Sequence, residues 1–138
     1  MYKIIIASHG NLAQSMNDAL RLFVGEDKDV YSICLDEKGI SEFEKKADKV
    51  IEEIGEDEVL IFTDLFYGSP FNVFSSKVER LKNSYEIIAG MNMPGILEAV
   101  LKQKEMSLKE ALPSIIEANN PVIFSEKLNL NNINEDDE

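Results

Sequence analysis

The chain has 138 residues, of which 44% are hydrophobic and 29% are charged, a composition that fits a folded globular domain and excludes a disordered or fibrous chain. Its formal net charge of -12, from 14 basic and 26 acidic residues, argues against nucleic acid and anionic lipid surfaces as partners. Cys34 has no second cysteine to pair with, and neither a signal-like N-terminus nor an apolar run of about 20 residues is present, so we expect a cytoplasmic protein.

Strand-like and helix-like patterns alternate along the chain. The stretch "YKIIIA" (2–7) is a continuous apolar run, which is typical of a strand buried on both faces. The next segment has apolar residues at helical spacing and ends at a glycine, which predicts an amphipathic helix over 12–23 with Leu12 and Phe23 on its buried face. Further strands are expected at 29–35, 58–63 and 85–90, and further helices at 40–54, 70–81, 95–104 and 107–118.

The sequence pattern of residues 121–138 differs from that of the preceding chain. "PVIF" (121–124) is expected to form a short edge strand, because Pro121 cannot donate to a ladder on both sides. Such a strand could pair with its own sheet or with the sheet of a second subunit. Residues 126–138 carry four consecutive acids at their end and little to bury, so we expect a disordered tail after a single domain over 1–125.

This alternation predicts an α/β fold with an open, mainly parallel sheet and helices on both faces. We expect strand order 2-1-3-4. The order then reverses between strands 1 and 3, and ligands of such sheets gather beyond the carboxyl ends of the strands at that point.

Two chemically active side chains follow these two strands directly. His9, the only histidine in the chain, ends the first strand, and Asp64 follows the third. Because adjacent strands lie about 4.8 Å apart, their side chains can meet in a hydrogen bond. A carboxylate on Nδ1 would fix the tautomer of the imidazole and leave Nε2 as a nucleophile. The alternative is a structural histidine beside a helix-capping aspartate.

The segment after Asp64 predicts a binding place for an anion. In "LFYGSPF", Ser69 is a good N-cap and Pro70 suits the first helical position, so unpaired amides would face the crevice. Asn11 and Gln14 resemble a capping box that would start the first helix beside His9.

Other residues of this rim suit a protein partner. Met91 and Met93 look exposed and adaptable, and Phe66 and Tyr67 are either docking residues or partly buried loop aromatics. Cys34 is expected to fill the core. We expect no cofactor and no metal, since the glycine motifs of nucleotide sites and the spacing of zinc ligands are absent from the sequence.

At these residues the sequence resembles the IIA component of the mannose-type sugar phosphotransferase system, over residues 2 to 125. The resemblance rests on "IIIASHG", on "FTDLFYGSPFN" and on "YEIIAGMNMPGILE". It implies that His9 accepts a phosphoryl group on Nε2 from the phosphocarrier HPr and passes it to a histidine of a IIB component. It further implies that Asp64 orients the ring and that the phosphoryl group lies by Ser69, Gly68 and Gly10.

The resemblance also implies a homodimer with an exchanged last strand, for which "NNPVIF" is suited, and a contact with the membrane only through the permease components, which recognise the sugar. The chain departs from the family at Tyr67, where a glycine is common, and at Gly95, where a larger hydrophobic residue is usual. Both positions are expected on the docking rim.

Two other functions stay open at this point. One is the phosphoryl-donor subunit of a dihydroxyacetone kinase, which has a similar fold and histidine. The other is a receiver-like signalling module phosphorylated on Asp64, although Ser8 and His9 stand where a receiver has its acidic pair.

Overall fold

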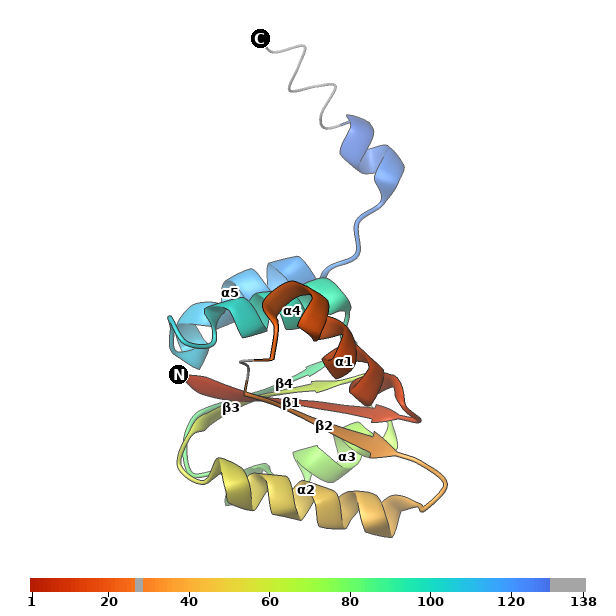
Figure 1. Ribbon diagram of the computed structural model, residues 1–138, viewed down its shortest axis with the longest axis vertical. Coiled ribbons are helices and arrows are strands. Elements are labelled where there is room, and N and C mark those ends of the chain that lie inside the picture. Colours follow the sequence, from red (N-terminus) through yellow and green to blue (C-terminus); the bar gives the residue numbers. More distant parts are fainter. Residues whose placement is uncertain (27–28, 130–138) are drawn as a thin grey trace.

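A computed structural model describes residues 1–26 and 29–129 as three layers, with a parallel sheet between two sets of helices (Figure 1). In chain order the elements are β1 (Tyr2–His9), α1 (Leu12–Val24), β2 (Val30–Leu35), α2 (Ile40–Ile54), β3 (Glu58–Thr63), α3 (Ser69–Ser75), the 3₁₀ helix η1 (Val78–Arg80), β4 (Tyr85–Ala89), α4 (Met93–Lys102) and α5 (Leu108–Asn119). None of the described helices is long and apolar enough to span a bilayer.

The sheet has the expected order, β2-β1-β3-β4, and every strand pair is parallel. In this register Ala7 lies opposite Thr63, and His9 lies opposite Leu35. The residues that follow β1 and β3 therefore leave the sheet at the same edge and from neighbouring strands.

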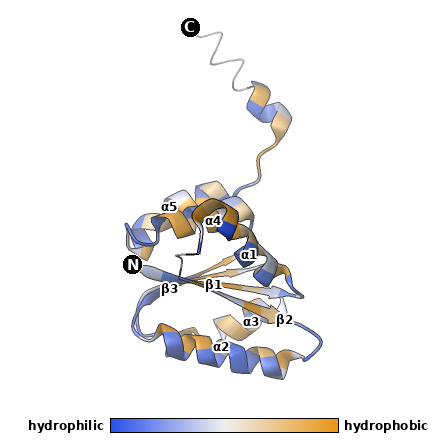
Figure 2. Cartoon of the chain, viewed as in Figure 1, coloured by the Kyte–Doolittle hydropathy of each residue, from blue (hydrophilic) through white to orange (hydrophobic). Residues whose placement is uncertain are grey.

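The alternation of β1 divides the core in two. Tyr2, Ile4 and Ile6 face the layer of α1, α4 and α5, whereas Ile5 and Ala7 face the layer of α2 and α3. All five are fully buried. The helices turn their apolar sides to the sheet and their polar sides outward (Figure 2). Because side chains alternate along a strand, Ser8 belongs to the first side of the sheet and His9 to the second.

Buried hydrogen bonds hold the amino edge of the sheet, where the strands begin. The side chain of Gln103, 1% exposed, donates to the carbonyls of Tyr2 and Asp29 at 2.9 and 2.8 Å. The Tyr2 hydroxyl donates to the Ala99 carbonyl at 2.6 Å. Burial, together with the Glu98 carboxylate, raises the pKa of Tyr2 well above its ordinary value. These contacts fix α4 to the start of β1.

Two helices differ from the expectation. The expected helix 70–81 ends at Ser75 and is followed by η1, because the hydroxyls of Ser75 and Ser76 bond to the carbonyls of Asn72 and Val73 and compete with the next helical turn. In α1 the expected burial of Leu12 and Phe23 is wrong, since they are 46% and 60% exposed.

A single copy of the chain does not form the expected strand at 121–124. Residues 121–123 have no regular structure and 124–129 are helical, and this segment leads away from the layers (Figure 1). The segment joins neither edge strand of the sheet, β2 or β4, and Val122, Ile123 and Phe124 stay 71%, 58% and 75% exposed. Of the expected disordered tail, 126–129 belong to this helical turn and 130–138 lie outside the described residues.

Candidate functional site

The carboxyl edge of the sheet brings His9 and Asp64 together. Nδ1 of the imidazole lies 2.9 Å from Oδ2 of Asp64, and the backbone N–H of His9 donates to the same oxygen at 3.0 Å. A carboxylate accepts hydrogen bonds and cannot donate them, so this contact assigns the proton of the neutral ring to Nδ1. Nε2 therefore keeps its lone pair. The ring is 43% exposed, which leaves it open to a partner.

The Asp64 side chain is hydrogen-bonded to His9 and does not cap a helix. Its side chain is only 13% exposed, and within the described part of the chain its other oxygen, Oδ1, is buried without a partner. The helix that follows has Gly68 as its N-cap and no side-chain cap. The capping aspartate considered as an alternative is thus not what the structure contains.

Gly68 lies directly against the imidazole. A Cβ atom added to Gly68 would come within 2.8 Å of Cε1 and 3.6 Å of Nε2 of His9. Its φ of -81° is one that any residue can adopt, so close approach and not backbone conformation demands glycine here. The chain after Asp64 therefore forms one wall of the site.

Ser69 and Gly10 border the site in ways that differ from the expectation. Ser69 is the first residue of α3 and not its N-cap, and its hydroxyl has no hydrogen-bond partner among the residues described. Gly10 has φ +57° and donates its N–H to the Leu35 carbonyl at 2.8 Å, so it turns the chain while extending the pairing of β1 with β2. Its amide is therefore already occupied.

The expected capping box at Asn11 and Gln14 is wrong. No side chain of Asn11 caps α1, and Gln14 instead accepts a hydrogen bond from the Ser32 hydroxyl. The cap comes from Ser8, which is fully buried and accepts from the Ala13 amide at 2.7 Å. Strand alternation could have identified this residue, because it places Ser8 under α1 and its neighbour His9 on the opposite side.

Three aromatic rings, two of them exposed, form a cluster next to Gly68. Phe66 and Tyr67 are 62% and 72% exposed, and their rings lie 4.0 Å apart. The ring of Phe71, a half-buried residue of α3, has its centroid 5.0 and 5.6 Å from those of Phe66 and Tyr67. Tyr67 has φ +61°, a left-handed conformation that costs a non-glycine residue about 1 kcal/mol. This is the position where the resemblance makes a glycine common.

The two methionines of the rim are less open than expected. Met91 and Met93 are half-buried and pack against the core on the α1, α4 and α5 side. The expectation that Gly95 lies on the docking rim is wrong, because Gly95 is buried under the side chain of Asn119, which a Cβ would meet at 2.2 Å. Asn119 occupies the space that a larger residue at position 95 would need.

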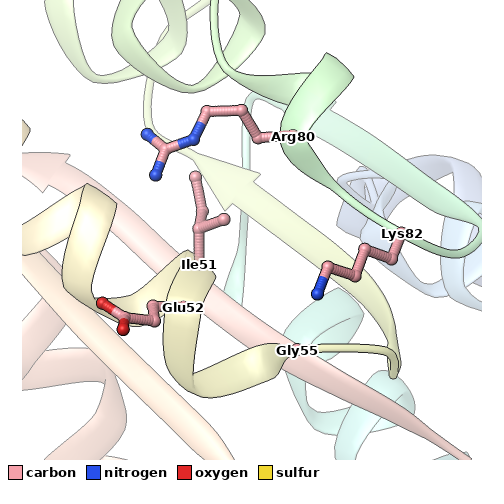
Figure 3. A pocket seen from close by; sticks show the side chains of 5 residues that line it. All are labelled: Ile51, Glu52, Gly55, Arg80 and Lys82. Atoms are coloured by element: carbon pink, nitrogen blue, oxygen red, sulfur yellow. The ribbon is translucent and has the colours of Figure 1, made fainter.

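A separate pocket of about 280 Å³ lies between the end of α2 and η1 (Figure 3). Its lining residues are Ile51, Glu52, Gly55, Arg80 and Lys82. Both elements adjoin the amino edge of the sheet, so the pocket is at the opposite end from His9. Cys34 packs half-buried against the core.

The chain matches a family model described as "PTS system fructose IIA component" over residues 3–116. It is 26% identical over 117 residues to the fructose-specific EIIA component of Bacillus subtilis (83% of this chain, 80% of that protein) and 28% identical over 115 residues to the sorbose-specific EIIA component of Lacticaseibacillus casei (83% of each). Among solved structures, the phosphotransferase system component EIIA from Streptococcus agalactiae superimposes with a TM-score of 0.81 at 29% identity, covering 91% of this chain and 99% of that one.

Proposed function

This chain belongs to the family of PTS system fructose IIA components, and we propose that within such a system it carries a phosphoryl group on His9 between two other proteins. The donor is the phosphocarrier HPr and the acceptor is a IIB component, so that the chain acts as a phosphotransferase in sugar uptake. The observation that carries this proposal is the 2.9 Å contact of Nδ1 with Asp64, which leaves Nε2 as the free nucleophile.

The transfer exchanges one nitrogen-phosphorus bond for another. The lone pair of His9 Nε2 forms a bond to the phosphorus of the donor as the donor's own nitrogen-phosphorus bond breaks, and the electron pair of that bond stays on the donor. Nδ1 keeps its proton, so the phosphorylated ring carries a positive charge. The Asp64 carboxylate already lies 2.9 Å from Nδ1 and stabilises this charge without moving. Transfer to the acceptor reverses these steps.

The phosphoryl group on Nε2 would lie beside Gly68 and Ser69. Gly68 contacts the ring from the side of α3, and the Ser69 hydroxyl is free to donate. The first amides of a helix have no partner within it and suit a phosphate oxygen. Gly10 contributes by its turn, since its amide is used in the sheet. We assign no role to a metal or a cofactor.

The aromatic cluster of Phe66, Tyr67 and Phe71 adjoins this site and is the surface on which we expect both partners to dock. Met91 and Met93, half-buried on the same edge of the sheet, would form the outer rim. Both partners must reach the same nitrogen, so they bind in turn and not together. We place this exchange in the cytoplasm, and contact with the membrane comes only through the permease components.

A homodimer remains part of the proposal. The resemblance implies that the last segment is shared between two subunits, and the three exposed apolar side chains Val122, Ile123 and Phe124 are those that a second subunit would cover. Sedimentation of the full chain and of a chain ending at Asn119 would compare their masses. A dimer that persists without the segment would place the interface elsewhere.

The structure favours His9 over Asp64 as the phosphorylated residue. Asp64 is mostly buried and receives two hydrogen bonds from His9, whereas a receiver needs its aspartate open to the phosphoryl donor. The matched family and the named relatives, which are fructose-specific and sorbose-specific components, support sugar uptake over a dihydroxyacetone kinase.

Labelling tests the proposal. The chain is incubated with phosphoenolpyruvate, enzyme I and HPr, and the label is mapped. We expect one label, on His9, that is lost in acid and stable in base, and we expect none with His9→Ala although that variant stays folded. A label that is lost in base would instead identify an aspartyl phosphate, and no label on the parent chain would refute the proposal.

A further inference from the structure

A groove of about 260 Å³ lies between α2 and α3, on the side of the sheet that His9 faces. Its lining residues are Ile40, Glu44, Ser69, Asn72, Val73 and Ser76. Figure 1 shows the two helices side by side under the sheet. Ser69 belongs to this α2/α3 groove and also follows Gly68, the residue in contact with the imidazole. The groove therefore shares Ser69 with the proposed phosphorylation site.

Three of the polar side chains that line the α2/α3 groove are unpaired, whereas the fourth, Ser76, donates its hydroxyl to the Val73 carbonyl at 2.7 Å. Within the part of the chain that the structure describes, the Glu44 carboxylate has no ion pair or hydrogen bond, and the side chains of Ser69 and Asn72 have no partner either. Glu42, two residues earlier on α2, shows the contrast, because its carboxylate lies 3.4 Å from Nζ of Lys45. Ile40 adds an apolar wall that is 49% exposed. An aliphatic stem would pack on Ile40, and a cationic head would donate to the Glu44 carboxylate and to the side-chain oxygens of Ser69 and Asn72.

The charge of the chain indicates where such a cation comes from. The formal net charge is -12, and the sequence has no lysine or arginine in residues 4–20 or 61–76, which surround His9 and Asp64. A donor protein must bring a phosphoryl group, itself negative, against this acidic surface. Basic side chains next to that group would offset the repulsion and guide the encounter.

We propose that the α2/α3 groove receives a basic side chain, an arginine or a lysine, of the protein that donates the phosphoryl group, with Glu44 as its counter-ion. The proposal rests on the phosphocarrier function proposed above. It makes Glu44 a specificity-determining residue for the donor, while the chemistry at His9 does not depend on it.

The experiment compares Glu44→Gln with Glu53→Gln. Both substitutions remove one negative charge from an exposed position of α2, but Glu53 is near the other end of the helix and does not line the groove. The readout is kcat/KM for phosphorylation of His9 by phosphorylated HPr at low and high salt. We expect Glu44→Gln to lower this value about fivefold at low salt, with a smaller difference at high salt, and Glu53→Gln to stay within about twofold of the parent.

A small phosphoryl donor without side chains, phosphoramidate, separates docking from chemistry. The parent and both variants should react with it at equal rates. A slower reaction of Glu44→Gln with phosphoramidate, or equal losses for the two variants with the protein donor, would overturn the proposal. If phosphorylated HPr does not label the parent at all, the phosphocarrier function itself fails, whereas a labelled parent with an unaffected Glu44→Gln variant refutes only the role of the groove.

Discussion

The two edges of the sheet differ in how fully their polar groups are bonded. At the amino edge, the buried side chain of Gln103, at the end of α4, donates hydrogen bonds to the carbonyls of Tyr2 and Asp29. Nζ of Lys3 lies 3.3 Å from Oδ2 of Asp29. At the carboxyl edge, an oxygen of Asp64 is buried without a partner, and the hydroxyl of Ser69 is unpaired within the described residues. The polar groups of the amino edge are thus bonded to side chains of the protein, whereas some of those at the carboxyl edge are not.

This difference separates stability from function. Hydrogen bonds and buried contacts at the amino edge hold the strands in place, so the carboxyl edge can keep features that cost free energy. These include the left-handed Tyr67, the exposed aromatic rings and the unpaired groups of the α2/α3 groove. Substitutions at the carboxyl edge should therefore slow phosphoryl transfer, whereas substitutions at the amino edge should lower the free energy of unfolding.

Among substitutions that keep His9, the largest effect is expected from Asp64→Asn. An asparagine can donate its amide hydrogen to Nδ1, which would move the ring proton to Nε2 and remove the nucleophile. We expect transfer to His9 to slow at least about 100-fold, or about 2.7 kcal/mol, while the protein stays folded. The measurement is the initial rate of labelling from phosphorylated HPr, together with the thermal midpoint.

Glu37→Gln is the control, because Glu37 is exposed in the loop that follows β2 at the same edge and loses the same charge. A rate for Asp64→Asn equal to that of the parent would remove the positioning role of Asp64. A loss of the same size in Glu37→Gln would attribute the effect to net charge.

The opposite edge is tested by Gln103→Ala. This change leaves the carbonyls of Tyr2 and Asp29 without the amide that binds them and opens a small cavity. We expect the free energy of unfolding to fall by about 2 kcal/mol, measured in urea, with an unchanged labelling rate per folded molecule.

Leu101→Ala, two residues earlier on α4 and 53% exposed, should lower the unfolding free energy by no more than about 0.5 kcal/mol. If Gln103→Ala slowed labelling under conditions where it is fully folded, the two edges would be coupled and the separation drawn above would be wrong.

The smallest effect is expected from Tyr67→Asn. Asparagine tolerates the left-handed conformation, so the turn that places Gly68 against His9 is kept while the exposed ring is lost. We expect unfolding to change by less than about 1 kcal/mol and the rate with phosphorylated HPr to fall about fivefold, with no change when phosphoramidate is the donor. An unchanged rate with HPr would remove Tyr67 from the docking surface.

The sequence predicted the features that follow from chain pattern. The alternation of apolar runs and amphipathic segments gave the parallel sheet and its order, and the order alone placed His9 and Asp64 on neighbouring strand ends, where their contact is observed. These features depend on hydrophobic periodicity and on a topological rule, both of which can be read along the chain.

Features that depend on contacts between distant elements were missed. Asn11 and Ser69 are favourable capping residues by type, but a buried serine from the preceding strand caps α1, and the chain before α3 places Gly68 at its cap. Gly95 is a second example. A larger residue there would collide with the side chain of Asn119, which lies 24 positions away in the sequence. Local propensity carries no information on such partners.

One oxygen of Asp64 accepts from both the main chain and the ring of the same residue, and this has a spectroscopic consequence. The amide nitrogen and Nδ1 of the only histidine sense a common acceptor, so in a nitrogen-15 spectrum their two resonances should move together when the carboxylate is disturbed. Phosphorylation of the ring on Nε2 should shift the resonance of Nε2 more than the other two. Magnetic resonance of this single residue would thus distinguish the proposed phosphorylated form from the unphosphorylated one without any assignment of other signals.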